Sequence, residues 1–200
     1  MSVLLLDVMG TLVYDPFFVE MPAHFGLSFK ELLAQKHPRA WLDFELGVID
    51  ESTCLTRFFN DGRTFDQDAF RARVRDAYAF LPGIEALLVE LSSAAVPMHA
   101  LSNYSTWYRL IEEQLGLSRW VPWTFVSCHT GVRKPSEAAY LGAATALGVA
   151  PQDCFFVDDR PENVAAAEAV GMAGHVFRDA PTLRTALAAA GYLPIVTSNR

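Results

Sequence analysis

The 200-residue sequence predicts an α/β fold in which a doubly wound parallel sheet is covered by helices on both faces. Short, fully apolar runs recur along the chain, as expected for strands that are buried on both sides. Helical patterns separate most of these runs, and this alternation is typical of right-handed β-α-β connections. One long stretch after the first run offers helical patterns but no strand, which predicts an insertion into the sheet domain.

The predicted strands are short apolar segments, namely Val3–Leu6, Met98–Leu101, Thr124–Ser127, Cys154–Val157 and Gly174–Phe177. Apolar residues at helical spacing, or an alanine-rich composition, predict helices over Ile84–Leu91, Ala138–Leu147 and Asn163–Val170. Because parallel strands run in one direction, their carboxyl ends meet at one edge of the Rossmann-like sheet, which is where ligands bind in such folds.

The insertion is predicted to span residues 15–79, which leaves residues 1–14 and 80–200 for the α/β core. Its helical windows are Ser28–Gln35, Pro38–Leu46, Glu51–Phe59 and Asp66–Phe80. Because the insertion leaves the core directly after the first strand, we expect it to cover the carboxyl edge of the sheet as a helical cap.

Charge and composition exclude several classes of protein. The net charge of −7 and the lack of any basic block argue against nucleic-acid binding, which requires clustered cations. No apolar run approaches the length of a membrane span, and no secretory signal is recognisable, so we expect a cytoplasmic monomer or homodimer. Cys54, Cys128 and Cys154 are widely spaced and are expected to be buried thiols of a reducing compartment.

Polar side chains follow four of the predicted strands. They are Asp7 with Thr11 in Asp7-Val8-Met9-Gly10-Thr11, Ser102 with Asn103, Lys134, and the pair Asp158 and Asp159. A single polar residue after a strand is more often a turn or helix-capping residue. Polar residues after four strands, all at the same edge of the sheet, indicate a functional site. Clustered carboxylates require a hard cation such as Mg²⁺, and a lysine and a hydroxyl beside that cation suit a phosphoryl group.

The ordered motifs resemble those of the haloacid dehalogenase-like hydrolases, most of which are Mg²⁺-dependent phosphatases. The resemblance implies that Asp7 is a nucleophile that forms an aspartyl-phosphate intermediate. It also implies that Asp7, Asp159 and the main-chain carbonyl of Met9 bind Mg²⁺, with Asp158 in support.

The same resemblance assigns the remaining motif residues to the phosphoryl group. Ser102, Asn103, Lys134 and Thr11 are implied to bind the phosphorylated substrate, with Ser102 and Lys134 also counted as catalytic. Arg133, next to Lys134, is expected to add positive charge there. The insertion resembles the small helical cap of this family, and the implied function is hydrolysis of a small phosphomonoester.

One position departs from the family pattern, because Met9 occupies the place of the usual general acid and base. Loss of such a group typically lowers the rate by about 10²–10⁴-fold. Asp15, Glu20 and His24 follow closely and are possible replacements, although surface or capping roles are the stronger expectation. A phosphate-binding or regulatory protein with weakened catalysis is therefore an open alternative.

A 2-haloacid dehalogenase is a second alternative, since those family members also lack the second acid of the first motif. They work without a metal, however, and the pair Asp158 and Asp159 would then carry an uncompensated electrostatic cost. The sequence therefore favours the phosphatase.

The opening Asp7-Val8-Met9 and the segment His37–Trp41 are further similar to flavin mononucleotide hydrolases of plant plastids in the same family. Flavin mononucleotide is accordingly a candidate substrate. Aromatic side chains of the cap can stack on a flavin ring, although burial in the cap core is the stronger expectation for them. They are Phe17, Phe18, Trp41 and Phe44.

Overall fold

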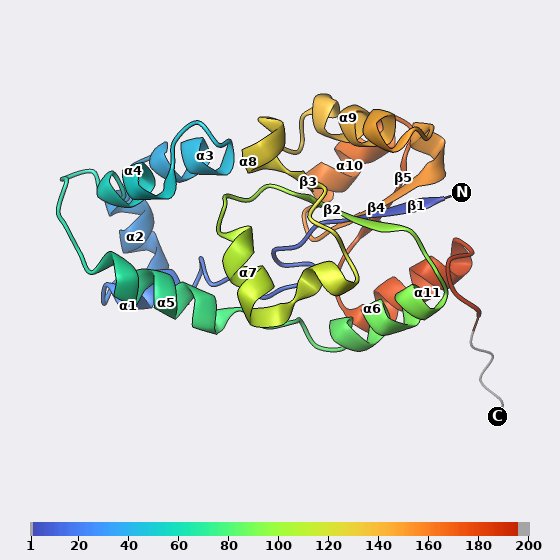
Figure 1. Cartoon of the computed structure of the whole chain (residues 1–200), viewed down its shortest axis with the longest axis horizontal. Coiled ribbons are helices and arrows are strands. Elements are labelled where there is room, and N and C mark those ends of the chain that lie inside the picture. The colour runs from blue at the N-terminus through green and yellow to red at the C-terminus, as the bar shows by residue number, and fades with distance from the viewer. Residues whose placement is uncertain (1, 196–200) are drawn as a thin grey trace.

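The computed structural model describes residues 2–195 and confirms the predicted α/β architecture (Figure 1). Five parallel strands form one sheet in the order β3-β2-β1-β4-β5. The strands are β1 (Val3–Leu6), β2 (Met98–Ser102), β3 (Phe125–Val126), β4 (Cys154–Asp158) and β5 (Ala173–Val176). All five predicted strands are present, with β3 shorter than expected and β5 beginning one residue earlier.

Helices cover both faces of this sheet. They are α6 (Ile84–Ser93), α7 (Tyr108–Leu115), α8 (Ser127–Thr130), α9 (Glu137–Leu147), α10 (Pro161–Ala169) and α11 (Ala180–Ala189), with short 3-10 helices at Leu117–Arg119 and Pro151–Asp153. In Figure 1, α9 and α10 lie on one side of the sheet, while α6 and α11 lie on the other. The predicted helices correspond to α6, α9 and α10, whereas α7, α8 and α11 were not predicted.

Strand β1 shows why its residues are all apolar. Leu4 and Leu6 belong to the core cluster that contains α6 and α11, and Val3 and Leu5 belong to the cluster that contains α9 and α10. Alternate side chains of a strand point to opposite faces, so a strand with helices on both faces has no polar position. Burial of each of these side chains contributes about 1.5–3 kcal/mol.

The segment between β1 and α6 contains five helices and forms the cap at the left of Figure 1. They are α1 (Glu20–His24), α2 (Phe29–Gln35), α3 (Ala40–Glu45), α4 (Glu51–Thr56) and α5 (Gln67–Ala77). Where the chain enters and leaves this segment, the Tyr14 amide donates to the Ala79 carbonyl at 2.9 Å, and the Leu81 amide donates to the Leu12 carbonyl at 2.9 Å. These hydrogen bonds join the two segments that connect the core with the cap.

Aromatic rings form much of the cap interior. The Phe25 ring has four other phenylalanine rings within 5.7 Å, centroid to centroid. They are Phe58, Phe59, Phe65 and Phe70. Phe44 is buried in the same cluster, as expected. The interior of the cap is therefore packed, and it is continuous with the core cluster that contains α6 and α11.

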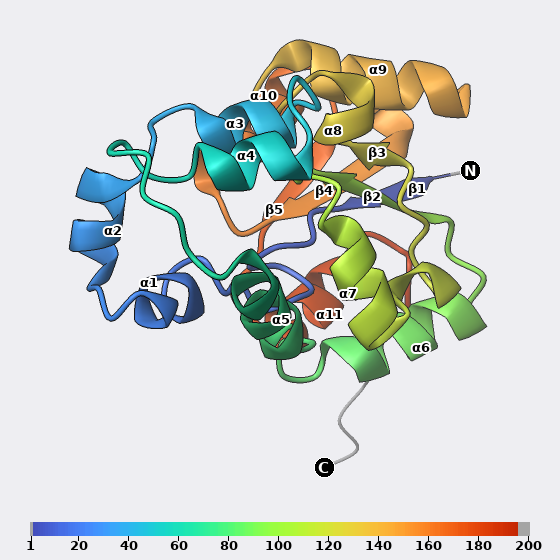
Figure 2. The ribbon, with the colours of Figure 1, turned by 60° about the vertical axis from the view of Figure 1, so that its left-hand side comes forward.

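The cap also docks directly on the core, between α3 and α8 (Figure 2). Gly47, just after α3, has a φ of +69°, and a Cβ at this position would lie 2.2 Å from the Cys128 carbonyl oxygen. Nearby, the Ser127 hydroxyl donates to the Glu45 carbonyl. Only glycine permits this approach of the two backbones.

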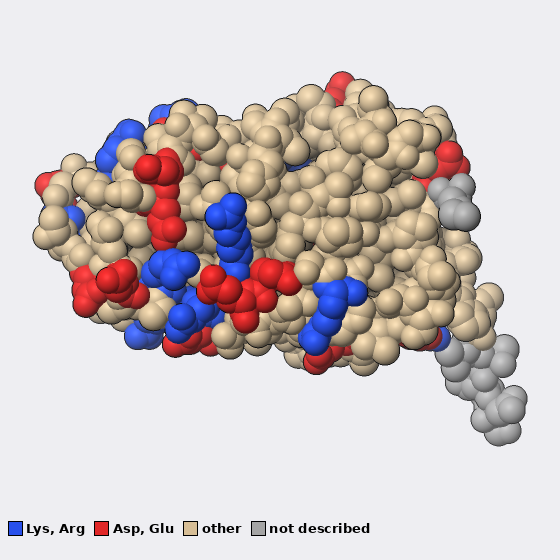
Figure 3. Space-filling view, in the orientation of Figure 1, with Lys and Arg blue, Asp and Glu red and all other residues tan. Residues whose placement is uncertain are grey.

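Charged side chains of both signs are interspersed over the cap and the adjoining part of the core on the face shown in Figure 3. Several of them form exposed ion pairs, such as Arg71 with Glu51 and Arg119 with Glu85. None of the helices within residues 2–195 is both long and apolar enough to cross a bilayer. The three cysteines are free thiols, of which Cys128 is half-buried and the other two are buried.

Candidate active site

The site begins where β1 ends, because the chain turns sharply after Asp7. The amides of Leu12 and Val13 both donate to the Val8 carbonyl at 2.9 Å, which closes the turn. Gly10 in this turn has a φ of +79°, and a Cβ here would lie 2.8 Å from an Asp159 carboxylate oxygen. The glycine thus allows the first loop to lie against the residue that follows β4.

Lys134 connects two strand ends. Its Nζ lies 2.6 Å from Asp7 Oδ1 and 2.6 Å from Asp158 Oδ2, and all three side chains are buried. Asn163, in the first turn of α10, donates from Nδ2 to both oxygens of Asp158 at 3.0 Å. Asp158 is thereby saturated by protein donors and serves to hold Lys134 in place.

The carboxylates of Asp7, Asp158 and Asp159 each offer an oxygen within 4.8 Å of the others. Burial, opposed in part by Lys134, raises the pKa of Asp7 to about 7, and burial with the nearby Asp158 charge raises the pKa of Asp159. Three carboxylates beside one ammonium leave excess negative charge. An all-oxygen donor set of this kind fits Mg²⁺.

Thr11 belongs to the framework of the cluster. Its hydroxyl donates to Asp7 Oδ2 at 3.3 Å and accepts from the Asp159 amide at 3.0 Å. The threonine is fully buried, so it links the ends of β1 and β4.

The two residues predicted from the end of β2 behave differently. Asn103 lines the pocket, but its amide group accepts from the Lys134 amide at 2.8 Å and donates to the Lys134 carbonyl at 2.9 Å. Ser102 is buried, and its hydroxyl has no hydrogen-bond partner among the described residues. It lines a separate apolar cavity of about 340 Å³ behind Lys134, rather than the pocket in front of Asp7. The structure therefore places Ser102 beside the cluster without exposing it to the pocket.

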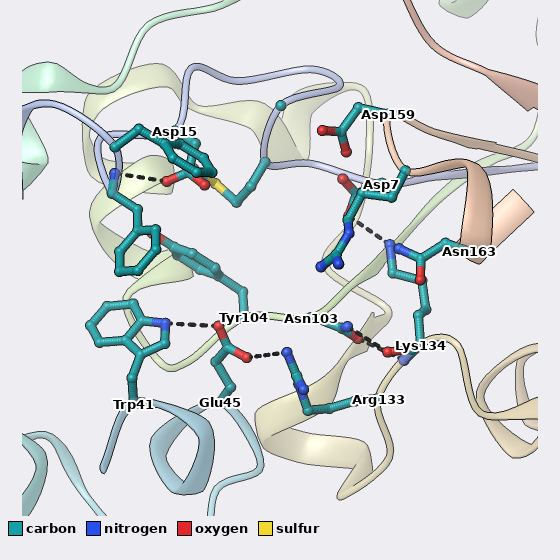
Figure 4. Close-up of a pocket in the computed structure, with 15 residues that line it drawn as sticks. Asp7, Asp15, Trp41, Glu45, Asn103, Tyr104, Arg133, Lys134, Asp159 and Asn163 are labelled. Atoms are coloured by element: carbon teal, nitrogen blue, oxygen red, sulfur yellow. Dashed lines mark hydrogen bonds and ion pairs between the residues drawn. The ribbon is translucent and has the colours of Figure 1, made fainter. Parts of the chain in front are cut away.

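In front of the cluster lies a pocket of about 500 Å³ between core and cap (Figure 4). Asp7, Asp159 and Lys134 lie at one end, and Asp15 and Trp41 lie at the other. Its aromatic lining is supplied by Phe17, Phe18, Trp41 and Tyr104. Three of the four aromatic residues expected in the cap core therefore contribute to the pocket instead, and the fourth, Phe44, is buried.

A buried acid of the cap ties the cap to the loop that carries Lys134. Glu45 Oε2 lies 2.7 Å from an Arg133 guanidinium nitrogen, and Glu45 Oε1 accepts from Trp41 Nε1 at 2.7 Å. Burial raises the pKa of Glu45, although Arg133 opposes this effect. The indole and the guanidinium are thus held in fixed positions on the pocket wall.

Asp15 also lines the pocket, contrary to the expected surface role. Its Oδ1 accepts from the Phe17 amide at 2.9 Å, so it also closes a turn. Burial raises the pKa of Asp15 to about 6. Glu20 and His24 do not line the pocket, since Glu20 accepts from the Tyr14 hydroxyl and His24 packs on Phe25.

Most of the chain matches a model of a known protein family. A model described as haloacid dehalogenase-like hydrolase matches residues 1–171. The chain belongs to this family. It is therefore an enzyme of the hydrolase class, and the resemblance inferred from the four motifs is confirmed.

Curated relatives of the chain include several phosphatases. It is 45% identical over 183 residues to the chloroplastic flavin mononucleotide hydrolase 1 of Arabidopsis thaliana, covering 92% of this chain and 75% of that protein. It is 37% identical over 93 residues to hexitol phosphatase A of Escherichia coli, covering 46% of this chain and 42% of that protein.

Solved structures share the fold. A family enzyme from Bacteroides thetaiotaomicron, in complex with magnesium and inorganic phosphate, superposes with a TM-score of 0.71 at 18% identity. The match covers 89% of this chain and 94% of that one. A dehalogenase superposes with a TM-score of 0.64 at 17% identity, covering 87% and 83% of the two chains.

Asn163, Glu45 and Tyr104 belong to the site and were not predicted. Asn163 follows Asp158 by five positions and lies at the start of α10, so a carboxamide one helical turn beyond the acidic pair was a usable signal. Glu45 gave no such signal, because its partner Arg133 is distant in the sequence and only the fold brings them together.

Proposed function

We propose that this hydrolase is a Mg²⁺-dependent phosphatase that cleaves flavin mononucleotide to riboflavin and phosphate. The observation that carries the proposal is a single pocket whose two ends differ. One end holds Asp7, Lys134 and Asp159, which suit a phosphoryl group, and the other end is lined by aromatic rings. The Arabidopsis relative named above, a flavin mononucleotide hydrolase, supports this choice of substrate.

In the proposed reaction, Asp7 attacks the phosphorus and forms an aspartyl-phosphate, which water then hydrolyses. Lys134 holds Asp7 Oδ1 at 2.6 Å and Thr11 donates to Asp7 Oδ2 at 3.3 Å, so both bonds orient the carboxylate at the wall of the pocket. The ammonium also stabilises the negative charge that develops on the phosphoryl oxygens. Thr11 fixes the loop behind the nucleophile through its bonds to Asp7 and the Asp159 amide.

Mg²⁺ would be held by Asp7, Asp159 and the Met9 carbonyl, and when bound it would neutralise charge on the phosphoryl group. Asp158 takes no direct part in this arrangement, because Lys134 and Asn163 occupy its oxygens. Its role is to hold the Lys134 ammonium in place beside Asp7.

The aromatic end of the pocket has the chemistry to bind an isoalloxazine ring by stacking. Trp41 is fixed by its bond to Glu45, and Phe17 packs edge-on against Phe18 at 5.5 Å between centroids. The cavity volume of about 500 Å³ lies within the range of small-molecule sites. A small sugar phosphate would need neither the aromatic lining nor a cavity of this volume. For this reason we prefer flavin mononucleotide as the substrate.

Phosphate release from flavin mononucleotide tests the proposal, measured with MgCl₂ or with EDTA and compared with a hexitol phosphate. We expect Mg²⁺-dependent turnover with a preference for flavin mononucleotide, and loss of turnover in Asp7→Asn. Binding of flavin mononucleotide without turnover would indicate the weakened regulatory protein instead. Halide release from a 2-haloacid that persists in EDTA would indicate the dehalogenase.

A further inference from the structure

The proposed reaction leaves one chemical requirement unassigned, the proton that the departing alkoxide must receive. An alkyl phosphate such as flavin mononucleotide has a poor leaving group, so this proton transfer limits its cleavage. Met9 lines the pocket where an acid would be expected, but a thioether carries no transferable proton.

Most ionisable groups of the pocket are already committed. Asp7 and Asp159 belong to the carboxylate cluster, and Lys134 is held by two carboxylates. Glu45 is paired with Arg133, and guanidinium groups do not release protons in proteins.

The phenol of Tyr104 is equally unsuited to the task. Its hydroxyl is hydrogen-bonded to the Tyr78 hydroxyl, and burial raises its pKa well above the usual value. Among the described residues that line the pocket, Asp15 is the carboxyl group that is neither in the metal cluster nor in an ion pair.

The position of Asp15 matches the geometry of the reaction. In a phosphoryl transfer the attacking and leaving oxygens lie on opposite sides of the phosphorus, roughly in line. With Asp7 attacking the phosphorus, the leaving oxygen lies on the far side of the phosphorus from Asp7 and faces the side of the pocket where Asp15 lies (Figure 4). We propose that Asp15 is the general acid that protonates the leaving oxygen, and then the general base that activates water.

The surroundings of Asp15 favour retention of its proton. The groups that interact with it from other parts of the chain are all acids or phenols, namely Tyr14, Glu20, Glu45, Tyr78, Tyr104 and Asp159. Burial is the largest effect on the Asp15 pKa, and the charges of Asp159 and Glu20 act in the same direction. A carboxyl group with a pKa of about 6 can both give and accept a proton near neutral pH.

The two steps balance with this single proton. In the first, the bond from Asp7 to phosphorus forms, the bond from phosphorus to the leaving oxygen breaks, and the Asp15 proton passes to that oxygen. In the second, water attacks the phosphorus and gives its proton to the Asp15 carboxylate, and Asp7 departs as a carboxylate. Phosphate is released and Asp15 is again protonated.

The decisive comparison uses two esters of similar shape that differ in their leaving groups. Asp15→Asn keeps the oxygen that accepts from the Phe17 amide but removes the acid. We expect kcat/KM for phenyl phosphate to fall by about 10²–10⁴-fold, because phenolate leaves poorly without a proton. The fall for p-nitrophenyl phosphate should be far smaller, because that anion is stabilised. Asp15→Glu should recover part of the loss.

A pH profile supplies the second readout. On the alkaline side of the pH profile, kcat/KM of the wild type for phenyl phosphate should decline, because Asp15 has lost its proton there. The Asp15→Asn variant, measured with the same ester, should not show this decline. Because ionisation of the ester affects both profiles equally, the difference between them reports on the enzyme. Asp50→Asn is the matched control, because Asp50, like Asp15, accepts from a backbone amide of the cap but lies outside the pocket lining. The ratio of its kcat/KM values for the two esters should equal that of the wild type.

The assignment rests on the proposed phosphatase function, and the two fail separately. Equal losses for both esters, or no loss for either, would overturn the role of Asp15. Cleavage of the aryl phosphates without cleavage of flavin mononucleotide would overturn only the choice of substrate. If the wild type with Mg²⁺ cleaves none of the three, the phosphatase function is wrong, and the assignment of Asp15 is wrong with it.

Discussion

Lys134 is the residue whose loss should most disturb the free energy of unfolding. It is buried and bonded at 2.6 Å to both Asp7 and Asp158, so Lys134→Met leaves those carboxylates without their cation. Breaking a buried ion pair in this way costs about 3–5 kcal/mol. Urea unfolding measures the loss. Arg160→Met is the control, because the Arg160 ion pair with Glu162 is exposed and is worth at most about 1 kcal/mol. If both variants lose the same free energy of unfolding, the buried ion pairs of Lys134 contribute no more to stability than an exposed pair.

A second test of the proton donor adds an acid at position 9 instead of removing one. In an Asp15→Asn background, Met9→Asp adds a carboxyl group to the wall of the same pocket. We expect the double variant to cleave phenyl phosphate faster than Asp15→Asn alone, since a positioned acid is worth about 10²–10⁴-fold. Initial rates of phenol release measure the effect. A double variant no faster than the single one would show that position 9 cannot supply the proton.

Contact between α3 and α8 depends on Gly47, which suggests a matched pair of glycine variants. Gly47→Ala brings a methyl group to 2.2 Å from the Cys128 carbonyl oxygen, whereas the Cβ of Gly26→Ala meets nothing within 4 Å. Both glycines have a left-handed φ, near +69° and +66° respectively.

Gly26→Ala should therefore lose only the conformational cost of about 1–2 kcal/mol. Gly47→Ala should lose clearly more and should raise KM for flavin mononucleotide, because α3 carries Trp41 and Glu45. Thermal unfolding and steady-state kinetics measure the two effects. Indistinguishable variants would show that the cap does not depend on this contact.

Much of the sheet could be predicted from sequence, because β1 is apolar throughout and β4 is apolar at every position before Asp158. The limits of β3 were less clear, since only Phe125 and Val126 pair with β2. Helix α8 was missed because Ser127–Thr130 has too few residues to show a helical period.

The candidate site was predictable to the extent that its residues follow strands. Asp7, Lys134 and Asp159 were found in this way and do converge. The positions of Asp15 and of Ser102 were not predictable, because each depends on how the chain turns after a strand and on what packs against it. Asp15 turns into the pocket with Phe17, while Ser102 faces the cavity beneath α9.

Binding of Mg²⁺ should stabilise the whole molecule, because the carboxylate cluster joins residues from both ends of the core sequence. At about a hundred times its dissociation constant, a ligand adds about 2.7 kcal/mol, which for this size raises Tm by about 5–10 °C. Thermal scans in MgCl₂ measure the shift, with NaCl of equal ionic strength as the reference. Asp159→Asn should lose most of the shift, and an unchanged shift in that variant would place the ion elsewhere.

The docking of α3 on α8 has a consequence for the order in which products depart. On that side the Arg133–Glu45 pair forms part of the pocket wall, whereas Phe18, at the aromatic end, leaves 55% of its surface exposed. Riboflavin would leave past Phe18 while the phosphoryl group is still bonded to Asp7, and phosphate would form and depart only after that. Inorganic phosphate should then inhibit competitively with flavin mononucleotide, and riboflavin noncompetitively, as in a sequence where the alcohol leaves first.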